Sequence, residues 1–226
     1  MLSLRNWKPI HLCWWFRKHN LPIPPLFIGG PAVPVLNQVH WKIGDNDSAD
    51  PDTCSFDAID TTRTGQAKTT PFMVRIQVTN TGDAGGSQAW ELYYNSSDTT
   101  TGAVQVGAAL GANVLVDSVG GQPTDGANCD GSTVVYDYSG SYTWQNGEYD
   151  EGDGATDKLA LGADYYTDFQ FSVQFTADAA YSTTYYFFLY FNGGVLDNYS
   201  SSAKVATEAA PAGLDIPIAM YHYMHH

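Results

Sequence analysis

A period of two in the hydrophobic pattern constrains the fold of this chain more than any other feature. In the stretch DYYTDFQFSVQF, residues 164–175, bulky apolar side chains alternate with polar ones, which is typical of a strand with one face in a core. Residues 72–78 and 90–94 alternate in the same way. Residues 184–191, TYYFFLYF, are apolar on both faces, and this predicts a central strand or one whose outer face is covered.

Glycine-containing turns separate these segments. VRIQVTNTGDAGGSQAWELYYN, residues 74–95, is predicted to fold as a strand, a turn and a second strand. The sequence NGG at 192–194 is a hairpin signal. Seven or more short strands separated by turns predict an all-β protein, with an Ig-like antiparallel β-sandwich over residues 36–208 and a Gly- and Asp-rich insertion at about 95–165.

Both ends of the chain carry apolar side chains outside the predicted sandwich. Residues 1–35 form a basic arm whose second half, LPIPPLFIGGPAVPV, is rich in proline and is therefore extended. Residues 209–226 form an apolar tail. Segments this apolar lie either on their own domain or on another molecule. We expect docking to a partner through Trp7, Trp14, Trp15, Phe16, Leu26, Phe27 and Ile28 of the arm and through Ile216, Ile218, Met220, Tyr221 and Tyr223 of the tail.

Charge is distributed unevenly between the arm and the body. Residues 1–40 carry four basic residues and no acidic one, whereas residues 41–226 carry six basic and all 24 acidic residues of a chain with a net charge of -14. The acidic body argues against nucleic acid as a partner, because phosphate binding needs clustered Lys and Arg. The asymmetry suggests two surfaces with different partners, and a solvated acidic face with an incidental arm is the plainer alternative.

The apolar segments are too short or too interrupted for a secretory signal, which needs a run of about 7–15 residues, or for a membrane-spanning helix of about 20 residues. We therefore expect neither a signal peptide nor a membrane partner.

Three cysteines are too few for a disulfide framework. Cys54 and Cys129, both in polar loops, could pair and leave Cys13 over, or all three could be free thiols.

Residue types that enzymes use as catalysts are poorly placed for catalysis. No histidine lies between residues 41 and 221, which disfavours a hydrolase with a Ser or Cys nucleophile. A glycosidase needs two carboxylates in one cleft, but most acidic residues fall in Gly/Ser/Asp loops. Glu91 and Asp168 lie in predicted strands, at outward positions where we expect no catalytic role. The prediction is a non-enzymatic protein.

Two acidic loops suggest calcium as a cofactor. DNDSADPD, with Asp45, Asp47, Asp50 and Asp52, and EYDEGDGATD at 148–157 cluster the oxygen ligands that Ca²⁺ prefers. Neither loop fits the EF-hand pattern, since the first lacks the glycine at the sixth position and the closing glutamate. We therefore expect solvated loops and no cofactor, with calcium as the weaker alternative.

The stretch VRIQVTNTGDAGGSQAWELYYN resembles the strand-turn-strand unit of bacterial and archaeal Ig-like domains of the CARDB type, in which V-x-V-x-N-x-G precedes a strand ending in Leu-Tyr. More broadly, the PPLF segment, VHWKIGDND, PFMVRIQVTNTGDA, DYYTDFQFSVQF and the ending GLDIPIAMYHYMHH are similar to structural proteins of tailed bacteriophages. This resemblance implies a virion component and brings no catalytic residues.

We therefore expect a virion structural protein, a capsid decoration or cement subunit on the outer surface of the particle. Its partners would be the major capsid protein, other virion proteins and further copies of itself. A tail, neck or fibre-base component would have the same features. Other classes are an Ig-like adhesin or carbohydrate-binding module using aromatic residues near Tyr142 and Trp144, a filament subunit in which residues 21–35 complete a neighbour's sheet, and an acidic glycoside hydrolase. The arm favours the structural protein, because a sugar-binding module has no need of it.

Overall fold

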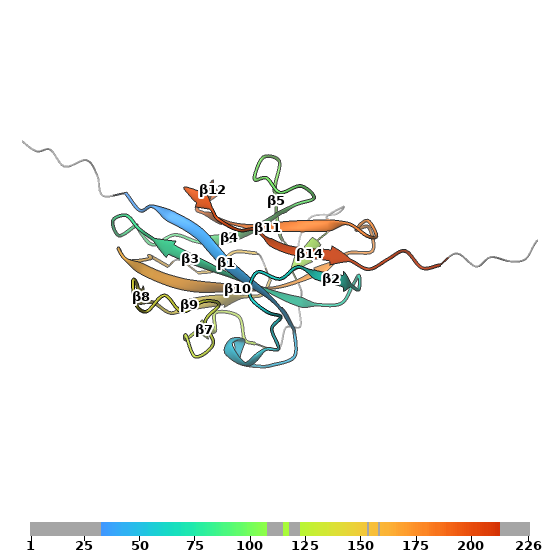
Figure 1. The fold of residues 1–226 in the computed structure, drawn as a ribbon, viewed down its shortest axis with the longest axis horizontal. Helices are drawn as coiled ribbons and strands as arrows, with labels where there is room; N and C mark the ends of the chain where they lie inside the picture. Colours follow the sequence, from blue (N-terminus) through green and yellow to red (C-terminus); the bar gives the residue numbers. More distant parts are fainter. Residues whose placement is uncertain (1–32, 108–114, 118–122, 153, 158, 213–226) are drawn as a thin grey trace, which may run out of the picture. The chain divides into compact units, whose positions relative to one another are not determined.

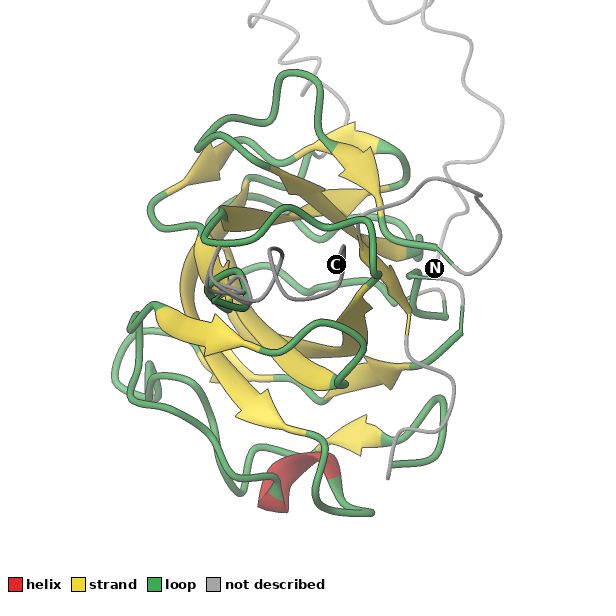
Figure 2. Ribbon diagram, turned by 90° about the vertical axis from the view of Figure 1, so that its right-hand side faces the viewer, coloured by secondary structure: helices red, strands yellow, loops and turns green. Residues whose placement is uncertain are grey.

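Two β-sheets packed face to face make up the described part of the chain, which comprises residues 33–107, 115–117, 123–152, 154–157 and 159–212 of a computed structural model (Figure 1, Figure 2). This arrangement confirms the predicted all-β class and the β-sandwich. The Ig-like assignment stays a prediction.

The first sheet has the order β13-β1-β3-β10-β9-β7, and β6 and β8 also pair with β10. Its strands are β1 (Leu36–Asp45), β3 (Phe72–Asn80), β6 (Leu115–Asp117), β7 (Asn128–Cys129), β8 (Thr143–Trp144), β9 (Gly147–Asp150), β10 (Tyr165–Phe175) and β13 (Asn198–Tyr199). The second sheet has the order β2-β14-β11-β4-β5, with β12 paired to β11. Its strands are β2 (Arg63–Gln66), β4 (Trp90–Asn95), β5 (Val104–Gln105), β11 (Thr184–Phe191), β12 (Gly194–Val195) and β14 (Ala203–Thr207).

Both sheets are mixed, whereas the sequence predicted antiparallel sheets. The long strands do pair antiparallel, as β3 does with both β1 and β10. Short strands instead run parallel to their partners where β13 joins β1, where β8 and β9 join β10, and where β2 joins β14. These short strands belong to long connections that return along a sheet and not to hairpins, so their direction is not set by a tight turn.

Alternating side chains of the two sheets meet in an apolar core. The predicted inward residues of β10, Phe169, Phe171, Val173 and Phe175, are all buried. Trp90 of the opposite sheet stacks on Phe169 with 4.6 Å between ring centroids. Burial contributes about 1.5–3 kcal/mol for each side chain of this size, so this core is the main force that holds the two sheets together.

One polar side chain crosses this core. Gln38 of β1 is fully buried, and its side-chain amide donates to the carbonyls of Phe187 (3.2 Å) and Ser201 (2.8 Å). Its Oε1 accepts from the backbone amide of Leu189 at 2.8 Å. Since Phe187 and Leu189 belong to β11, Gln38 ties the first sheet to the second by hydrogen bonds.

Strand β11 confirms the prediction drawn from its two apolar faces. It lies between β14 and β4 in the second sheet. On its outer face, Phe188 is buried and its ring packs edge-on against Tyr199, with 5.5 Å between centroids. The NGG turn joins β11 to β12, and Asn192 and Gly193 have φ values of 53° and 73°, which suits a hairpin turn with two positive φ angles.

The strand-turn-strand unit predicted at 74–95 is not a hairpin. β3 belongs to the first sheet and β4 to the second, so the connection between them carries the chain across the sandwich. Asn80 stabilises this corner, because its Oδ1 accepts from the amides of Val35 (3.1 Å) and Gly82 (3.0 Å). Its Nδ2 donates to three backbone carbonyls, those of Asp83, Leu161 and Gly162.

Residues of the Gly- and Asp-rich insertion cover the outer face of the first sheet. The insertion supplies the short strands β5 to β9. Its backbone amide at Val135 donates to the side chain of Asp168 on β10 at 2.8 Å, and its buried Tyr149 packs in one cluster with Met73 of β3. Residues 132–138 of the insertion form turns and bends.

The described chain begins at one end of the sandwich and leaves at the other. Val33 precedes β1 at the blue end of Figure 1, and residues 208–212 follow β14 at the opposite, red end. Within the described ranges, the helical element is the 3₁₀ turn η1 (Pro51–Thr53), and none of these residues forms a helix long and apolar enough to cross a membrane.

Candidate functional site

Arg75 is the centre of a polar cluster buried between the first sheet and the segments that cover it. Its side chain projects from the outer face of β3 and is 0% exposed. Nε donates to Asp168 of β10 at 3.1 Å, Nη2 donates to Asp52 of η1 at 2.6 Å, and Nη1 donates to the Pro51 carbonyl at 3.3 Å. One guanidinium therefore joins two strands of the sheet to the loop above them. We call Arg75, Asp52 and Asp168 the Arg75 cluster.

Each carboxylate of this cluster also accepts a backbone amide. Asp168 accepts from Val135 at 2.8 Å, and Asp52 accepts from Asp130 at 2.7 Å. Burial alone would lower the pKa of Arg75, but the neighbouring carboxylates outweigh this and raise it above the usual arginine value. Burial raises the pKa of Asp168, while Arg75 and the Val135 amide act in the opposite direction. The cluster is a closed network of charges with a structural role.

Asp168 lies on the outer face of β10, as the alternation predicted. The insertion covers that face, however, and leaves Asp168 0% exposed. Glu91, the other strand carboxylate, is only partly buried, and its Oε2 accepts from the amide of Gly193 at 2.9 Å. The two carboxylates thus lie in different sheets and do not form an acid/base pair.

Cys54 and Cys129 lie beside the same covered face, and both are buried free thiols. The structure therefore supports the free-thiol alternative for this pair, and Cys13 lies outside the described residues. The Sγ atom of Cys54 accepts from Gln170 at 3.7 Å. Burial raises the pKa of both thiols, so neither has the lowered pKa of a reactive cysteine.

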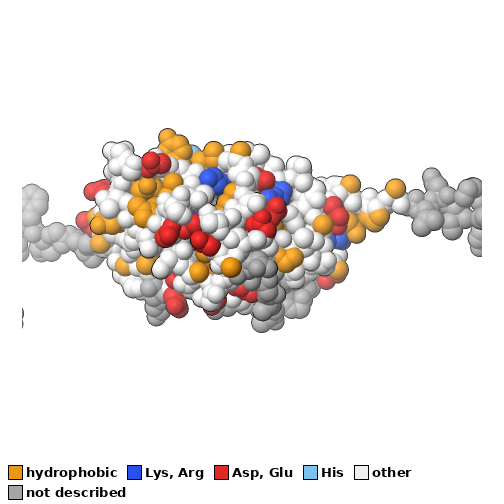
Figure 3. Space-filling view, turned by 90° about the horizontal axis from the view of Figure 1, so that it is seen from below, with side chains coloured by type: hydrophobic (Ala, Val, Ile, Leu, Met, Phe, Trp, Pro, Cys, Tyr) orange, Lys and Arg blue, Asp and Glu red, His pale blue; other side chains and the backbone are white. Residues whose placement is uncertain are grey.

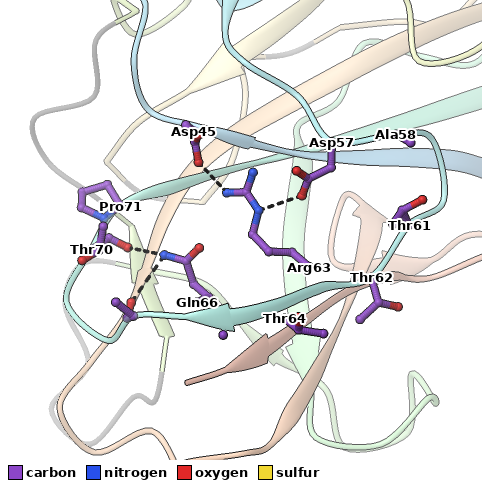
Figure 4. Close-up of a pocket in the computed structure, with 12 residues that line it drawn as sticks. Asp45, Asp57, Ala58, Thr61, Thr62, Arg63, Thr64, Gln66, Thr70 and Pro71 are labelled. Atoms are coloured by element: carbon purple, nitrogen blue, oxygen red, sulfur yellow. Dashed lines mark hydrogen bonds and ion pairs between the residues drawn. The ribbon is translucent and has the colours of Figure 1, made fainter. Parts of the chain in front are cut away.

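A hollow of about 590 Å³ lies beside the edge strand β2 (Figure 4). Arg63 occupies its wall, with Asp45 and Asp57 on either side of the guanidinium, each at 2.8 Å. Gln66 donates to the backbone carbonyl of Thr70 at 3.1 Å. Two carboxylates face one guanidinium, so the charged side chains of the wall bond to one another and leave one negative charge in excess.

A second hollow, of about 300 Å³, is lined by acidic side chains that include residues of the loop 148–157. Glu148 accepts from the backbone amide of Asp157 at 2.7 Å, and Asp125 accepts from that of Glu151 at 3.1 Å. Burial raises the pKa of Glu148. These carboxylates therefore already serve as acceptors for the loop's own backbone.

The four aspartates of the first predicted calcium loop are directed to four different partners. Asp47 accepts from the amide and the hydroxyl of Ser55, which lowers its pKa, and Asp50 caps η1 by accepting from the amide of Asp52 at 2.9 Å. Asp45 pairs with Arg63, as described above, and Asp52 belongs to the Arg75 cluster. In the part of the chain that the structure describes, no three His, Cys, Asp or Glu side chains form a group suited to a metal. For the calcium alternative, the described residues of this loop offer no assembled site.

His40 is the one histidine among the described residues. Its Nδ1 lies 2.6 Å from the Asp60 carboxylate, which is the arrangement of base and orienting acid in a catalytic triad. The neighbours of its ring are aromatic, however: Tyr136 at 4.9 Å and Tyr138 at 5.9 Å between centroids. No hydrogen bond joins His40 to a serine or cysteine within the described residues. The pair instead links β1 to the connection that carries Asp60.

The aromatic residues proposed for a sugar-binding module separate in the structure. Tyr142 lines a groove at the edge of the first sheet. Trp144 instead packs against Tyr166, with 5.1 Å between centroids, and its Nε1 donates to Asn146 at 3.1 Å. Of the two residues, Tyr142 therefore faces a groove, and the carbohydrate-binding alternative stays a prediction.

The predicted docking residues lie outside the described residues. These are Trp7, Trp14, Trp15, Phe16, Leu26, Phe27 and Ile28 of the arm and Ile216, Ile218, Met220, Tyr221 and Tyr223 of the tail. Their role in docking stays a prediction.

The surface of the sandwich is acidic in patches. Figure 3 shows several separate groups of acidic side chains on one face, with few basic side chains between them and hydrophobic ones scattered singly or in small groups.

No protein-family model, no curated protein and no solved structure matches this chain. The CARDB-type and bacteriophage resemblances therefore stay predictions, and the role of the chain has to be argued from its own geometry.

Proposed function

We propose that this chain is a non-enzymatic structural protein of a virus particle, a capsid decoration or cement subunit that neighbouring virion proteins hold through its arm and tail. The observation that carries the proposal is the path of the chain, which begins at one end of the sandwich and leaves at the opposite end (Figure 1). The arm and the tail are thus joined to the body at two separated points. Attachment at two points increases the effective concentration of each contact and retains the subunit on its partners.

The chemistry of the body supports the same proposal. In the Arg75 cluster and in the wall of the hollow beside β2, one arginine is ion-paired with two aspartates. These groups stabilise a covered sheet and are not arranged as nucleophile and base. A net charge of -14 suits an exposed subunit, because like charges keep particles apart in solution.

Light scattering after size exclusion tests the proposal on three chains: the full chain, a chain that begins at Val33, and a full chain with Trp14, Trp15 and Phe16 each replaced by serine. The shortened chain keeps Val33 because its carbonyl accepts from Asp83 at 3.1 Å. We expect the full chain to associate and the other two to be monomers. If the full chain is a stable monomer, as the serine variant is expected to be, a docking role for the arm is contradicted.

A further inference from the structure

A groove of about 280 Å³ lies at the edge of the first sheet. Its floor comes from β1 and β3, one wall comes from β13, and the other wall comes from the covering segment that carries Tyr138 and Tyr142. This volume lies close to the small end of the range for small-molecule sites.

The tyrosine wall is held in place before any ligand arrives. The carbonyl of Tyr138 accepts from the amides of Ser141 (2.8 Å) and Tyr142 (2.9 Å), which closes the loop between the two rings. Tyr138 also contacts the rings of Tyr136 (4.8 Å) and Tyr166 (5.9 Å), and Tyr142 stands at 90° to it with 5.7 Å between centroids. A wall fixed by its neighbours loses little conformational freedom when a ligand binds.

Side-chain amides and hydroxyls line the rest of the groove. On the floor, Asn37 and Thr81 are joined by a long hydrogen bond of 3.4 Å, and on the wall formed by β13, Asn198 donates to Ser200 at 3.2 Å. Each asparagine amide carries two donors and an acceptor oxygen. The floor and this wall therefore keep donors and acceptors with which a hydroxyl-rich ligand can pair.

The backbone of the floor is irregular at the same place. The pairing of β1 with β3 shifts register between Gln38 and His40, so Val39 is the extra residue of a β-bulge, and it lines the groove. Bulges re-aim a side chain and are enriched next to binding sites. Here the bulge places an apolar side chain beside the polar ones.

Among the described residues, no charged side chain lines the groove, although the chain as a whole has a net charge of -14. The other two hollows described above are lined by carboxylates. A lining without Lys or Arg disfavours phosphate, which those side chains bind most strongly, and it offers a cation no carboxylate ligand. A pyranose ring has an apolar C–H face and a rim of neutral hydroxyls, and aromatic rings next to amides and hydroxyls match both features.

We propose that this groove binds a neutral saccharide, with one sugar ring against the tyrosine wall and its hydroxyls bonded by Asn37 and Asn198. The inference goes beyond the structural role proposed above and does not depend on the arm or the tail. It gives the described body a binding partner of its own, a glycan.

Saturation-transfer NMR and titration of the full chain with neutral trisaccharides test this inference. The probes are maltotriose, cellotriose, mannotriose and N,N′,N″-triacetylchitotriose, and sialyllactose against lactose is the test of charge. We expect at least one neutral trisaccharide to bind with a Kd of about 1 mM or tighter. Lack of binding by every neutral probe at about 10 mM, or tighter binding of sialyllactose than of lactose, would overturn the proposal.

Three variants locate the site. Tyr142→Ala and Asn198→Ala should each weaken binding about tenfold or more, whereas Tyr181→Ala removes an exposed tyrosine between β10 and β11 and should leave it unchanged. The side chain of Asn198 is exposed and bonds only to Ser200 among the described residues, so Asn198→Ala decides the question if Tyr142→Ala loses its folded circular-dichroism spectrum. Unchanged binding by Asn198→Ala, or equal loss by Tyr181→Ala, would show that the saccharide binds elsewhere.

Discussion

Replacing Arg75 by methionine tests whether the buried charge cluster holds the covering segments on the first sheet. Methionine approximates the length of the arginine stem but leaves Asp52 and Asp168, both at most 1% exposed, without their cation. Removing one partner of a buried ion pair destabilises a protein by about 3–5 kcal/mol, which is a large share of a typical unfolding free energy of about 5–15 kcal/mol. At about 2–4 °C per kcal/mol for a chain of this size, Tm should fall by about 6–20 °C.

Urea unfolding followed by tryptophan fluorescence measures this loss. With an m-value of about 1–3 kcal/mol/M, the midpoint should fall by about 1 M or more while the slope stays the same. Arg75→Lys separates charge from geometry, because one ammonium keeps the charge but cannot reproduce the fork that reaches both carboxylates and the Pro51 carbonyl. We expect the free energy of unfolding of Arg75→Lys to lie between those of the wild type and Arg75→Met.

Lys204→Met is the matched control. Lys204 pairs with Asp98 at 3.6 Å on the surface, and exposed pairs of this kind contribute about 0–1 kcal/mol. If Arg75→Met costs no more than Lys204→Met, the Arg75 cluster does not stabilise the fold and the reasoning is refuted.

Three further predictions rest on single sites. Gln38→Leu should cost about 1–3 kcal/mol for each backbone group left unsatisfied, and hydrogen exchange at the Leu189 amide should become faster. Gly147→Ala should lower Tm because its Cβ would overlap the backbone carbonyl of Asp168, whereas Gly140→Ala, with no heavy atom within 4 Å of its Cβ, should not. Burial raises the pKa of Cys129 above its ordinary value of 9.0, so the folded state favours the neutral thiol. The resulting contribution to the free energy of unfolding is present below pH 9.0 and is lost as pH rises. The free energy of unfolding, measured with urea at several pH values, should therefore decline more steeply above pH 9.0 in the wild type than in Cys129→Ala.

The sequence predicted the strands well where alternation was strict. Phe169, Phe171, Val173 and Phe175 lie in the core as expected, because the side-chain period of a strand fixes which residues share a face. The same pattern does not tell whether a polar face meets water or another segment. For Asp168, the alternation therefore predicts the outward position but not the insertion that covers it. An arginine at position 75 in an otherwise uncharged strand was the available signal, since a buried guanidinium requires carboxylates nearby.

Alternation also does not identify which strands pair. The predicted strands at 74–80 and 90–95 follow one another in the chain, yet they lie in different sheets. The connection of residues 81–89 is longer than the 2–5 residues typical of hairpin loops, and this length was the signal against a hairpin. Likewise, an aspartate-rich loop has the same composition whether its carboxylates bind a cation or cap and pair locally. Asp47 and Asp50 do the latter.

The path of the chain through the sandwich also determines how the body would respond to mechanical tension. Pulling the two ends of the described chain apart draws β1 and β14 in opposite directions, each along its own axis (Figure 1). The hydrogen bonds between antiparallel strands are perpendicular to the strands, so those of β1 with β3 and of β14 with β11 would be strained in shear, all at once. A strand loaded in this way resists more than one that is peeled from its end bond by bond, and the body would act as a stiff link between whatever holds its two ends.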